Sequence, residues 1–294
     1  MQLKKLRGSD NALVGIVVTF LLIGLIVAVV SIIQTVYIPK WMEQTESEHM
    51  GEVADQFAQL KFAIDTQVAI HQPHTPIAIS IALGSRELPF LMSTRAFGSL
   101  DIISDSYRIV IEDRTGVIKF NNSLGTIKYS SSNAYFLDQS YIYETGAIVL
   151  SQYQGNIMSI KPTFSVQKEE NVNISFTIIN ISKVGGKGSI SGYGTYPIQT
   201  EYSPNSDKDF TSFEDISNIT IYTDYQNAWY GFINGTLIKA GLNYNGYGTN
   251  YTINISKENK IIVEFDASIT VNLDIKFIEI DGQIAPGWIE NTKV

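Results

Sequence analysis

The stretch "ALVGIVVTFLLIGLIVAVVSII", residues 12 to 33, decides how the rest of the chain is organised. It contains 22 consecutive residues without a charged side chain. A helix rises about 1.5 Å per residue, so this run is roughly 33 Å long, enough to cross the ~30 Å hydrocarbon core of a bilayer. We therefore expect residues 12–33 to form a helix that makes the membrane a partner of this chain.

The residues on either side of the apolar run predict its orientation. Lys4, Lys5 and Arg7 precede it, and Tyr37 and Trp41 follow it. Basic flanks stay in the cytoplasm and aromatic residues lie at the membrane interface, so the head is expected outside the cell. A removed secretory signal has a shorter apolar region and a small-residue cleavage site, and "QTVYIPKW" after the run offers none.

The residues around Gly8 leave two outcomes open. In "KKLRGSDNALVGIVV" the basic residues and Gly8 stand before a few polar residues, and only then does the apolar run begin. This pattern resembles the class III signal peptide of archaeal pilins and archaellins. The resemblance implies cleavage between Gly8 and Ser9 on the cytoplasmic side, with the apolar helix retained. Leu13 stands where many bacterial pilins carry glutamate, which weakens a bacterial origin more than an archaeal one. The alternative is an uncleaved anchor that starts at Met1.

A second helix is predicted after the membrane segment. Pro39 is expected to kink or end the first helix. Beyond it, apolar residues recur at spacings of three and four: Met50, Val53, Phe57, Leu60, Ile64 and Val68. This is the pattern of an amphipathic helix, whose seam packs either on the chain's own β domain or on another subunit. Glu46, Glu48, His49 and Glu52 lie on the first turns of this helix. His49 with Glu48 or Glu52 could ligate a metal, but a solvated polar face is the expected role of these four side chains.

The head is predicted to be β-rich. From Ile77 onward, short segments rich in Ile, Val, Thr, Tyr and Phe alternate with turn signals. The fold class is therefore mainly β with a long N-terminal α-helix: a transmembrane or pilin-like helix and stalk, then an antiparallel β-sandwich head of one or two sandwiches. One short helix is expected after Thr223 or Asp224 as cap, with one apolar side formed by Trp229, Phe232, Ile233 and Leu237.

The domain organisation follows from these segments. We expect a cytoplasmic basic leader at 1–8, a hydrophobic helix at 9–38, an amphipathic stalk helix at 39–71, a first β-sandwich region at 72–168 and a second β-rich region at 169–294.

Asn-x-Ser/Thr triplets are frequent in the head and predict N-glycosylation of an exported protein. They begin at Asn121, Asn173, Asn180, Asn218, Asn234, Asn250 and Asn254. Asn173 and Asn180 lie seven residues apart in one predicted strand, so they are expected to face opposite sides of it.

Composition and motifs argue against other functions. The net charge of −8 is unsuited to nucleic acid. The chain has no cysteine, which excludes disulfides and thiolate metal sites. All three histidines precede the head, so a Ser-His-Asp triad inside it is excluded.

Two further stretches suggest sites only superficially. The glycine-rich residues 185–194 match no phosphate-binding loop. The loop at 203–215 concentrates Asp207, Asp209, Glu214 and Asp215 and could hold calcium, but lacks EF-hand spacing. We therefore expect no catalytic residue, no cofactor and no metal site.

The layout as a whole resembles a group of uncharacterised archaeal envelope proteins that are pilin-like at the N-terminus. The resemblance is carried by "IPKWMEQTESEHMGEVADQFAQLKFAI", "PIAISIALGSRELPFLMSTRAFGSLDI" and "YIYETGAIVLSQYQGNIMSIKPTFSV". It implies a non-enzymatic cell-surface protein, a pilin-like subunit or accessory that is anchored by its N-terminal helix or assembles through it with itself or with other pilin-like subunits.

The alternative is a monomeric membrane-anchored binding module for glycan or S-layer components. Aromatic residues in "NAWYGF" or "NYNGYGTNY" would then stack on sugars.

Overall fold

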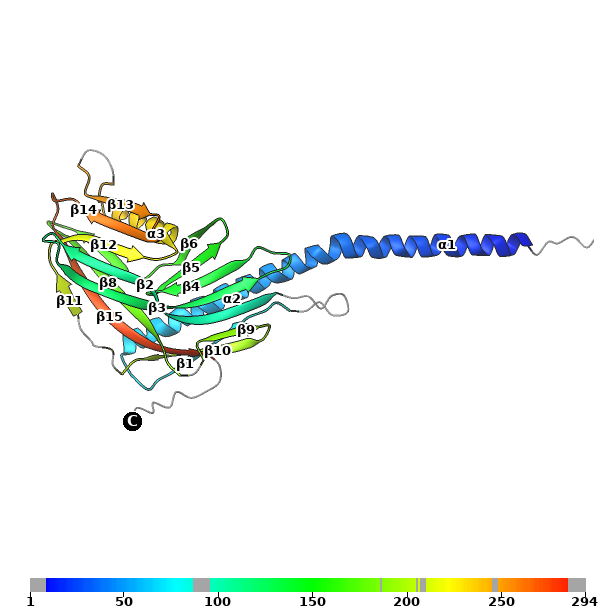
Figure 1. Ribbon diagram of the computed structural model, residues 1–294, viewed down its shortest axis with the longest axis horizontal. Coiled ribbons are helices and arrows are strands. Elements are labelled where there is room, and N and C mark those ends of the chain that lie inside the picture. Colours follow the sequence, from blue (N-terminus) through cyan, green and yellow to red (C-terminus); the bar gives the residue numbers. More distant parts are fainter. Residues whose placement is uncertain are drawn as a thin grey trace, which may run out of the picture.

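A computed structural model describes residues 9–86, 96–185, 187–204, 206, 210–244 and 248–284, with side chains from residue 14 onward. One long helix projects from a β-rich head (Figure 1). The predicted fold class, mainly β with a long N-terminal helix, is confirmed.

The helix runs without a break from Ser9 to Ile70. It consists of α1 (Ser9–Ile32), a π-helical turn η1 (Ile33–Tyr37) and α2 (Ile38–Ile70). Of the two outcomes predicted at Pro39, a kink or an end, the helix shows the kink and does not end. Proline lacks the N–H that an α-helical turn needs, and the wider π turn directly before it accommodates this, with the Ile38 N–H bonded to the Ile33 carbonyl. The helix axis bends at this point (Figure 1).

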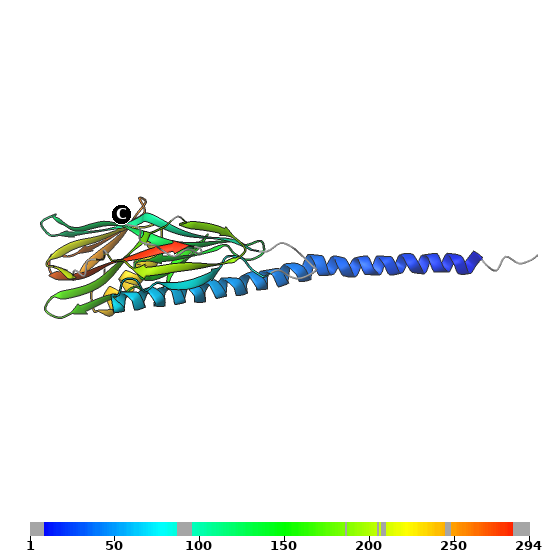
Figure 2. The ribbon, with the colours of Figure 1, turned by 90° about the horizontal axis from the view of Figure 1, so that it is seen from below.

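The amphipathic seam of α2 packs on the chain's own head, which was the first of the two alternatives. Its predicted residues are buried except for Val68, which is half-buried. In Figure 2, α2 lies lengthwise along one side of the head. The helix ends at His71, whose left-handed φ of 54° turns the chain toward the first strand.

Two sheets form the head. The six-stranded sheet contains β1 (Ile77–Ala82), β7 (Phe164–Lys168), β8 (Val172–Lys183), β10 (Thr195–Tyr202), β11 (Phe210–Phe213) and β15 (Val271–Ile284). The nine-stranded sheet contains β2 (Phe97–Asp113), β3 (Ile118–Ser132), β4 (Gln139–Glu144), β5 (Ala147–Gln152), β6 (Gly155–Ile160), β9 (Ser189–Gly192), β12 (Ile216–Tyr222), β13 (Tyr251–Ser256) and β14 (Lys260–Phe265). All of these strand pairs are antiparallel except β8 with β15, which run parallel over twelve residues.

The head contains two large hydrophobic cores. The α2 core surrounds the helix seam, and the α3 core surrounds a short helix, α3 (Gln226–Lys239). Strands β2, β3, β8 and β15 contribute to both. In β8, Ile174, Phe176 and Ile178 belong to the α3 core, whereas Ile179 and Ile181 belong to the α2 core. Because neighbouring residues point to opposite faces, each of these strands buries one face in one core and the other face in the second.

The two sheets touch backbone to backbone where the cores meet. A Cβ on Gly125 of β3 would lie 2.0 Å from the carbonyl oxygen of Ile181 on β8, so no side chain fits there. The Gly125 N–H donates to the side-chain oxygen of Asn180, at 2.8 Å. Glycine at this position therefore sets the distance between the sheets.

Strand pairing in both sheets joins residues before and after residue 168, for example β1 with β10 and β2 with β12. The long strands that serve both cores tie the head into one unit.

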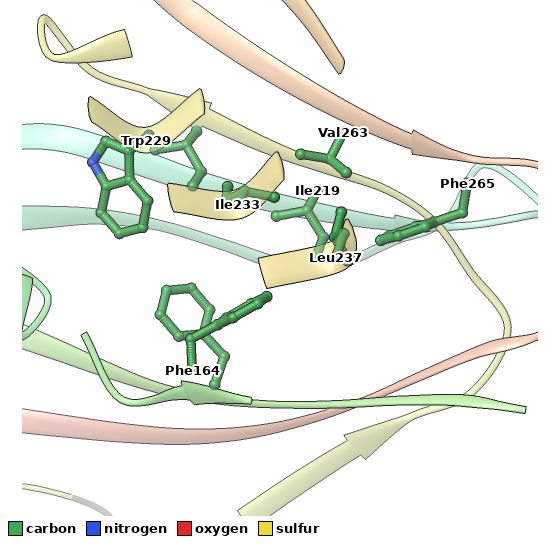
Figure 3. A pocket seen from close by; sticks show the side chains of 9 residues that line it. Phe164, Ile219, Trp229, Ile233, Leu237, Val263 and Phe265 are labelled. Carbon is green, nitrogen blue, oxygen red and sulfur yellow. The ribbon is translucent and has the colours of Figure 1, made fainter. Parts of the chain in front are cut away.

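Helix α3 has the predicted apolar side but not the predicted cap. Trp229, Phe232, Ile233 and Leu237 are buried. Figure 3 shows Trp229, Ile233 and Leu237. No side chain of the helix's own N-cap closes its first turn. Instead, Asn156 in β6 accepts a hydrogen bond from the Ala228 N–H, at 2.8 Å. The side chains drawn in Figure 3 close around a space of only about 10 Å³, so this part of the core is filled.

Candidate functional site: the apolar helix and its seat in the head

The first half of the long helix is apolar on every side and has no partner within the described chain. All described side chains from Val14 to Ile32 are exposed. The few polar ones bond within the helix: the Thr19 hydroxyl donates to the Gly15 carbonyl at 2.8 Å. A helix that is hydrophobic all round belongs in a membrane or in the core of an assembly. By length and composition this helix can cross a membrane.

Two aromatic residues lie at the end of the apolar surface that is nearer the head. The rings of Tyr37 and Trp41 lie one helical turn apart, with centroids separated by 6.0 Å, and about half of each residue is exposed. Rings of this kind, with an apolar body and a polar tip, are suited to the interface between a bilayer and water.

Polar side chains fix α2 against the head at three levels. The buried carboxylate of Glu46 accepts three consecutive backbone N–H groups, those of Ala134, Tyr135 and Phe136, at 3.0, 2.8 and 2.7 Å. Further along, the His49 Nε2 lies 3.0 Å from the Ala82 carbonyl oxygen. Near the end, the Gln67 side chain donates to the Thr200 carbonyl, at 2.6 Å.

These contacts make the seat of the helix specific. Apolar packing alone would tolerate a slide of α2 by one turn, whereas bonds to three separate backbone segments would not. The sequence pattern predicted the seam but gave no signal for the partners of Glu46 and Gln67, which lie 88 to 133 residues away along the chain.

The region around His49 does not form a metal cluster. Burial lowers the pKa of His49, which favours the neutral ring. Its Nδ1 has no hydrogen-bond partner among the described residues and borders a hollow of about 160 Å³, which Glu48, Glu52 and Arg86 also line. Within the described chain no three His, Cys, Asp or Glu residues are arranged to hold a metal ion.

A buried carboxylate that sequence analysis missed lies between β4 and α3. Glu144 is 1% exposed, and it accepts hydrogen bonds from the Trp229 indole at 2.8 Å and the Thr223 hydroxyl at 3.0 Å. Burial raises the pKa of Glu144 to about 7. Its place at the end of an apolar strand, directly before the turn Thr145–Gly146, was the only local sign that it would be buried.

An open polar cleft lies beside this carboxylate. Its volume is about 250 Å³, and its lining includes Tyr107, Arg108, Tyr222, Thr223 and Asp224. The Arg108 guanidinium carbon lies 4.3 Å from the centre of the Tyr222 ring and covers one face of it. The cleft therefore offers charged and hydroxyl groups more than an aromatic platform.

The aromatic residues considered for sugar stacking largely fill the head. In "NAWYGF", Trp229 and Phe232 are buried, and Tyr230 is half-buried. In "NYNGYGTNY", Tyr251 is buried, with its ring centroid 5.4 Å from that of Tyr244. Residues 245–247 of this stretch lie outside the described chain.

Other predicted positions are distributed over the molecule. Gly8 lies outside the described residues, and Ser9 is the first residue of α1. Ser189–Gly192 in the glycine-rich stretch form β9, which pairs with β2. Asp207 and Asp209 lie outside the described residues, whereas Asp215 pairs with Arg114 at 2.6 Å.

The seven Asn-x-Ser/Thr asparagines fall into two groups. Asn121, Asn173 and Asn254 are exposed, whereas Asn180, Asn218, Asn234 and Asn250 are half-buried. Asn173 and Asn180 face opposite sides of β8, because Asn180 contacts Gly125 of the other sheet and Asn173 is exposed.

Comparison with known proteins adds no identity. No protein family, curated protein or solved structure matches this chain.

Proposed function

We propose that this chain is a non-enzymatic cell-surface protein that displays its β head through the N-terminal helix, as pilin-like subunits do. The observation that carries the proposal is the division of one continuous helix into two halves. The described side chains from Val14 to Ile32 are mostly apolar and all exposed, whereas the part of the helix after Pro39 packs against the head. A helix seated so firmly transmits the position of its apolar half directly to the head.

The finer assignment is an archaeal pilin-like protein cleaved after Gly8, with the apolar helices of several copies packed together in a filament. Support comes from the residues around Gly8 and from the exposed surface of α1, which can lie in lipid before assembly and against other helices after it. A membrane-anchored monomer uses the same helix without assembly.

Charge substitution in the helix tests the anchoring. Leu22→Arg places a charge near the middle of the apolar run, which opposes membrane insertion by about 2.5–3.5 kcal/mol. We expect the wild-type chain to remain in the membrane fraction after alkaline carbonate washing and the variant to be lost from it. Gln59→Arg, on the exposed side of α2, is the matched control and should behave as wild type. A wild-type chain released by carbonate would contradict anchoring.

The N-terminal residue of the surface protein separates the two outcomes at Gly8. Mass spectrometry should find Ser9 as the first residue if the chain is processed as a pilin, and Gly8→Leu should then block both cleavage and filament formation. A surface protein that retains Met1 would contradict cleavage and support the anchored monomer.

A further inference from the structure

We propose that three of the seven Asn-x-Ser/Thr sites, Asn121, Asn173 and Asn254, are the N-glycan attachment sites of the folded head. This inference rests on the proposed function, because an exported head is one that meets glycosylating enzymes. All seven asparagines lie in described residues, so each can be judged by its exposure, its bonds and the position of its Ser or Thr.

The three sites present both required side chains outward. Asn121 and Asn173 are exposed together with Ser123 and Ser175, and Asn254 is exposed with a half-buried Ser256. In a strand, residues two apart point to the same side, so the asparagine and the hydroxyl face solvent together. Asn173 accepts a hydrogen bond through its oxygen from the half-buried side chain of Asn272, and rotation of the two side chains opens this bond without moving the backbone.

At two of the other sites, the asparagine side chain makes a hydrogen bond between the sheets or between neighbouring strands. Asn180 lies between them, and its side-chain oxygen accepts the Gly125 N–H at 2.8 Å. A sugar on its nitrogen would need space where the two backbones are in contact. Asn218 donates to Glu112 through Nδ2, the atom that would carry the glycan, at 3.0 Å, and Thr220 of its triplet is buried.

At the last two sites, on α3 and in the loop after it, the asparagine side chains also accept internal hydrogen bonds. Asn234 accepts a hydrogen bond from the Tyr251 hydroxyl at 2.7 Å, and the Thr236 hydroxyl of its triplet is bonded to the Phe232 carbonyl. The Asn250 side-chain oxygen accepts the Asn243 N–H at 3.0 Å, which closes the loop before β13.

The chemistry explains why these bonds matter. The donor is a lipid-linked oligosaccharide, in which C1 of the first sugar is bonded to a polyprenyl phosphate oxygen. Transfer breaks that C1–O bond, whose electron pair leaves with the phosphate, and forms a C1–Nδ2 bond. One Nδ2 proton passes to a base, and the enzyme must also bind the Ser or Thr hydroxyl. The asparagine side chain must therefore be able to leave its internal hydrogen bonds, whether they involve its oxygen or Nδ2, without opening the fold around it.

The geometry also spaces the glycans. Asn121 and Asn254 belong to one row across five strands, through the pairs Asn121–Val110, Val110–Thr220, Thr220–Ile262 and Ile262–Asn254. Paired residues share a face, and neighbouring strands lie about 4.8 Å apart, so roughly 19 Å separates the two attachment points. None of the seven sites lies on α2 itself.

The test uses the purified full chain in detergent, an oligosaccharyltransferase and a lipid-linked oligosaccharide, so it does not depend on where the chain resides in a cell. Seven synthetic peptides, each carrying one triplet, report the intrinsic reactivity of each site without the fold. Glycopeptide mass spectrometry then compares each site in the folded chain with its own peptide. Ser123→Ala, which keeps Asn121 but destroys its triplet, is the matched control.

We expect Asn121, Asn173 and Asn254 in the folded chain to react within about threefold of their peptides, and the other four at least about tenfold more slowly, since they must first open locally. Equal reactivity of Asn180 or Asn234 with the exposed sites would overturn the proposal, as would three unreactive exposed sites. If the three exposed sites react fast and the other four slowly, but carbonate washing removes the chain from membranes, only the proposed anchoring is contradicted.

Discussion

The Trp229 indole donates a hydrogen bond to the Glu144 carboxylate at 2.8 Å inside the head. The carboxylate is enclosed and has no cationic partner in the hydrogen-bond and ion-pair network of the described residues. Two hydrogen bonds from neutral donors do not fully offset the loss of hydration, which is why the folded state favours the protonated form.

Stability should therefore depend on pH through Glu144. Its pKa is about 7 in the folded chain and near 4.5 when unfolded. Below pH 4.5 both states hold the proton; from there to pH 7 only the folded state does, so the free energy of unfolding falls as pH rises, by about 3 kcal/mol in all. Glu144→Gln should flatten this dependence in urea titrations at several pH values. Exposed Glu169→Gln should preserve it, and an unchanged slope in Glu144→Gln would rule out this origin.

The Glu46 carboxylate should contribute strongly to the free energy that holds α2 against the head. Glu46→Ala leaves three backbone N–H groups of residues 134–136 without their acceptor, and we expect a loss of about 3–5 kcal/mol in unfolding free energy. Exposed Glu48→Ala, two residues along the same helix, should change it by less than about 0.5 kcal/mol. Equal effects in chemical denaturation would show that the bonds to the loop contribute little.

Two glycine-to-alanine substitutions should act in opposite directions. Gly125→Ala forces a methyl group against the Ile181 carbonyl and should destabilise the head by more than about 3 kcal/mol or prevent folding. Gly231→Ala, on an exposed side of α3 with nothing within 4 Å of the added carbon, should stabilise it by up to about 1 kcal/mol. Thermal unfolding measures both, and a neutral Gly125→Ala would contradict the close contact of the sheets.

Two phenylalanines on α2, one buried and one exposed, should contribute very differently to the free energy of unfolding. Phe57 is fully buried in the α2 core, and Phe57→Ala should cost about 3–5 kcal/mol. Phe62 is 74% exposed, and Phe62→Ala should leave the unfolding free energy within about 0.5 kcal/mol of wild type. If copies assemble through the outer side of α2, Phe62→Ala will still weaken assembly, which sedimentation of shed material can measure.

Local patterns predicted the local elements well. The uncharged run at 12–33, the seam from Met50 to Ile64 and the apolar side of α3 depend on spacing within one helix, and each is present as expected. The sequence left open whether Pro39 kinks or ends the helix, because a π turn before a proline leaves no mark in the apolar pattern.

Features that join distant segments could not be predicted. Which strands pair, the parallel contact of β8 with β15 and the acceptor role of Glu46 all depend on partners far away in the sequence. One sign was visible in "SFTIINIS": the two consecutive isoleucines, Ile178 and Ile179, break the alternation where the strand passes from one core to the other. In the sequence, a strand that changes its buried face looks the same as an ordinary apolar run, so the change can be recognised only when both cores are known.

The seating of α2 along one side of the head has a mechanical consequence. A force applied along α1 enters the head parallel to the helix axis, where the seam and the bonds of Glu46, His49 and Gln67 resist it in shear. Contacts loaded in shear must yield together, whereas a hairpin pulled open from one end yields one pair at a time. Tension along the helix would thus be spread over the length of the head.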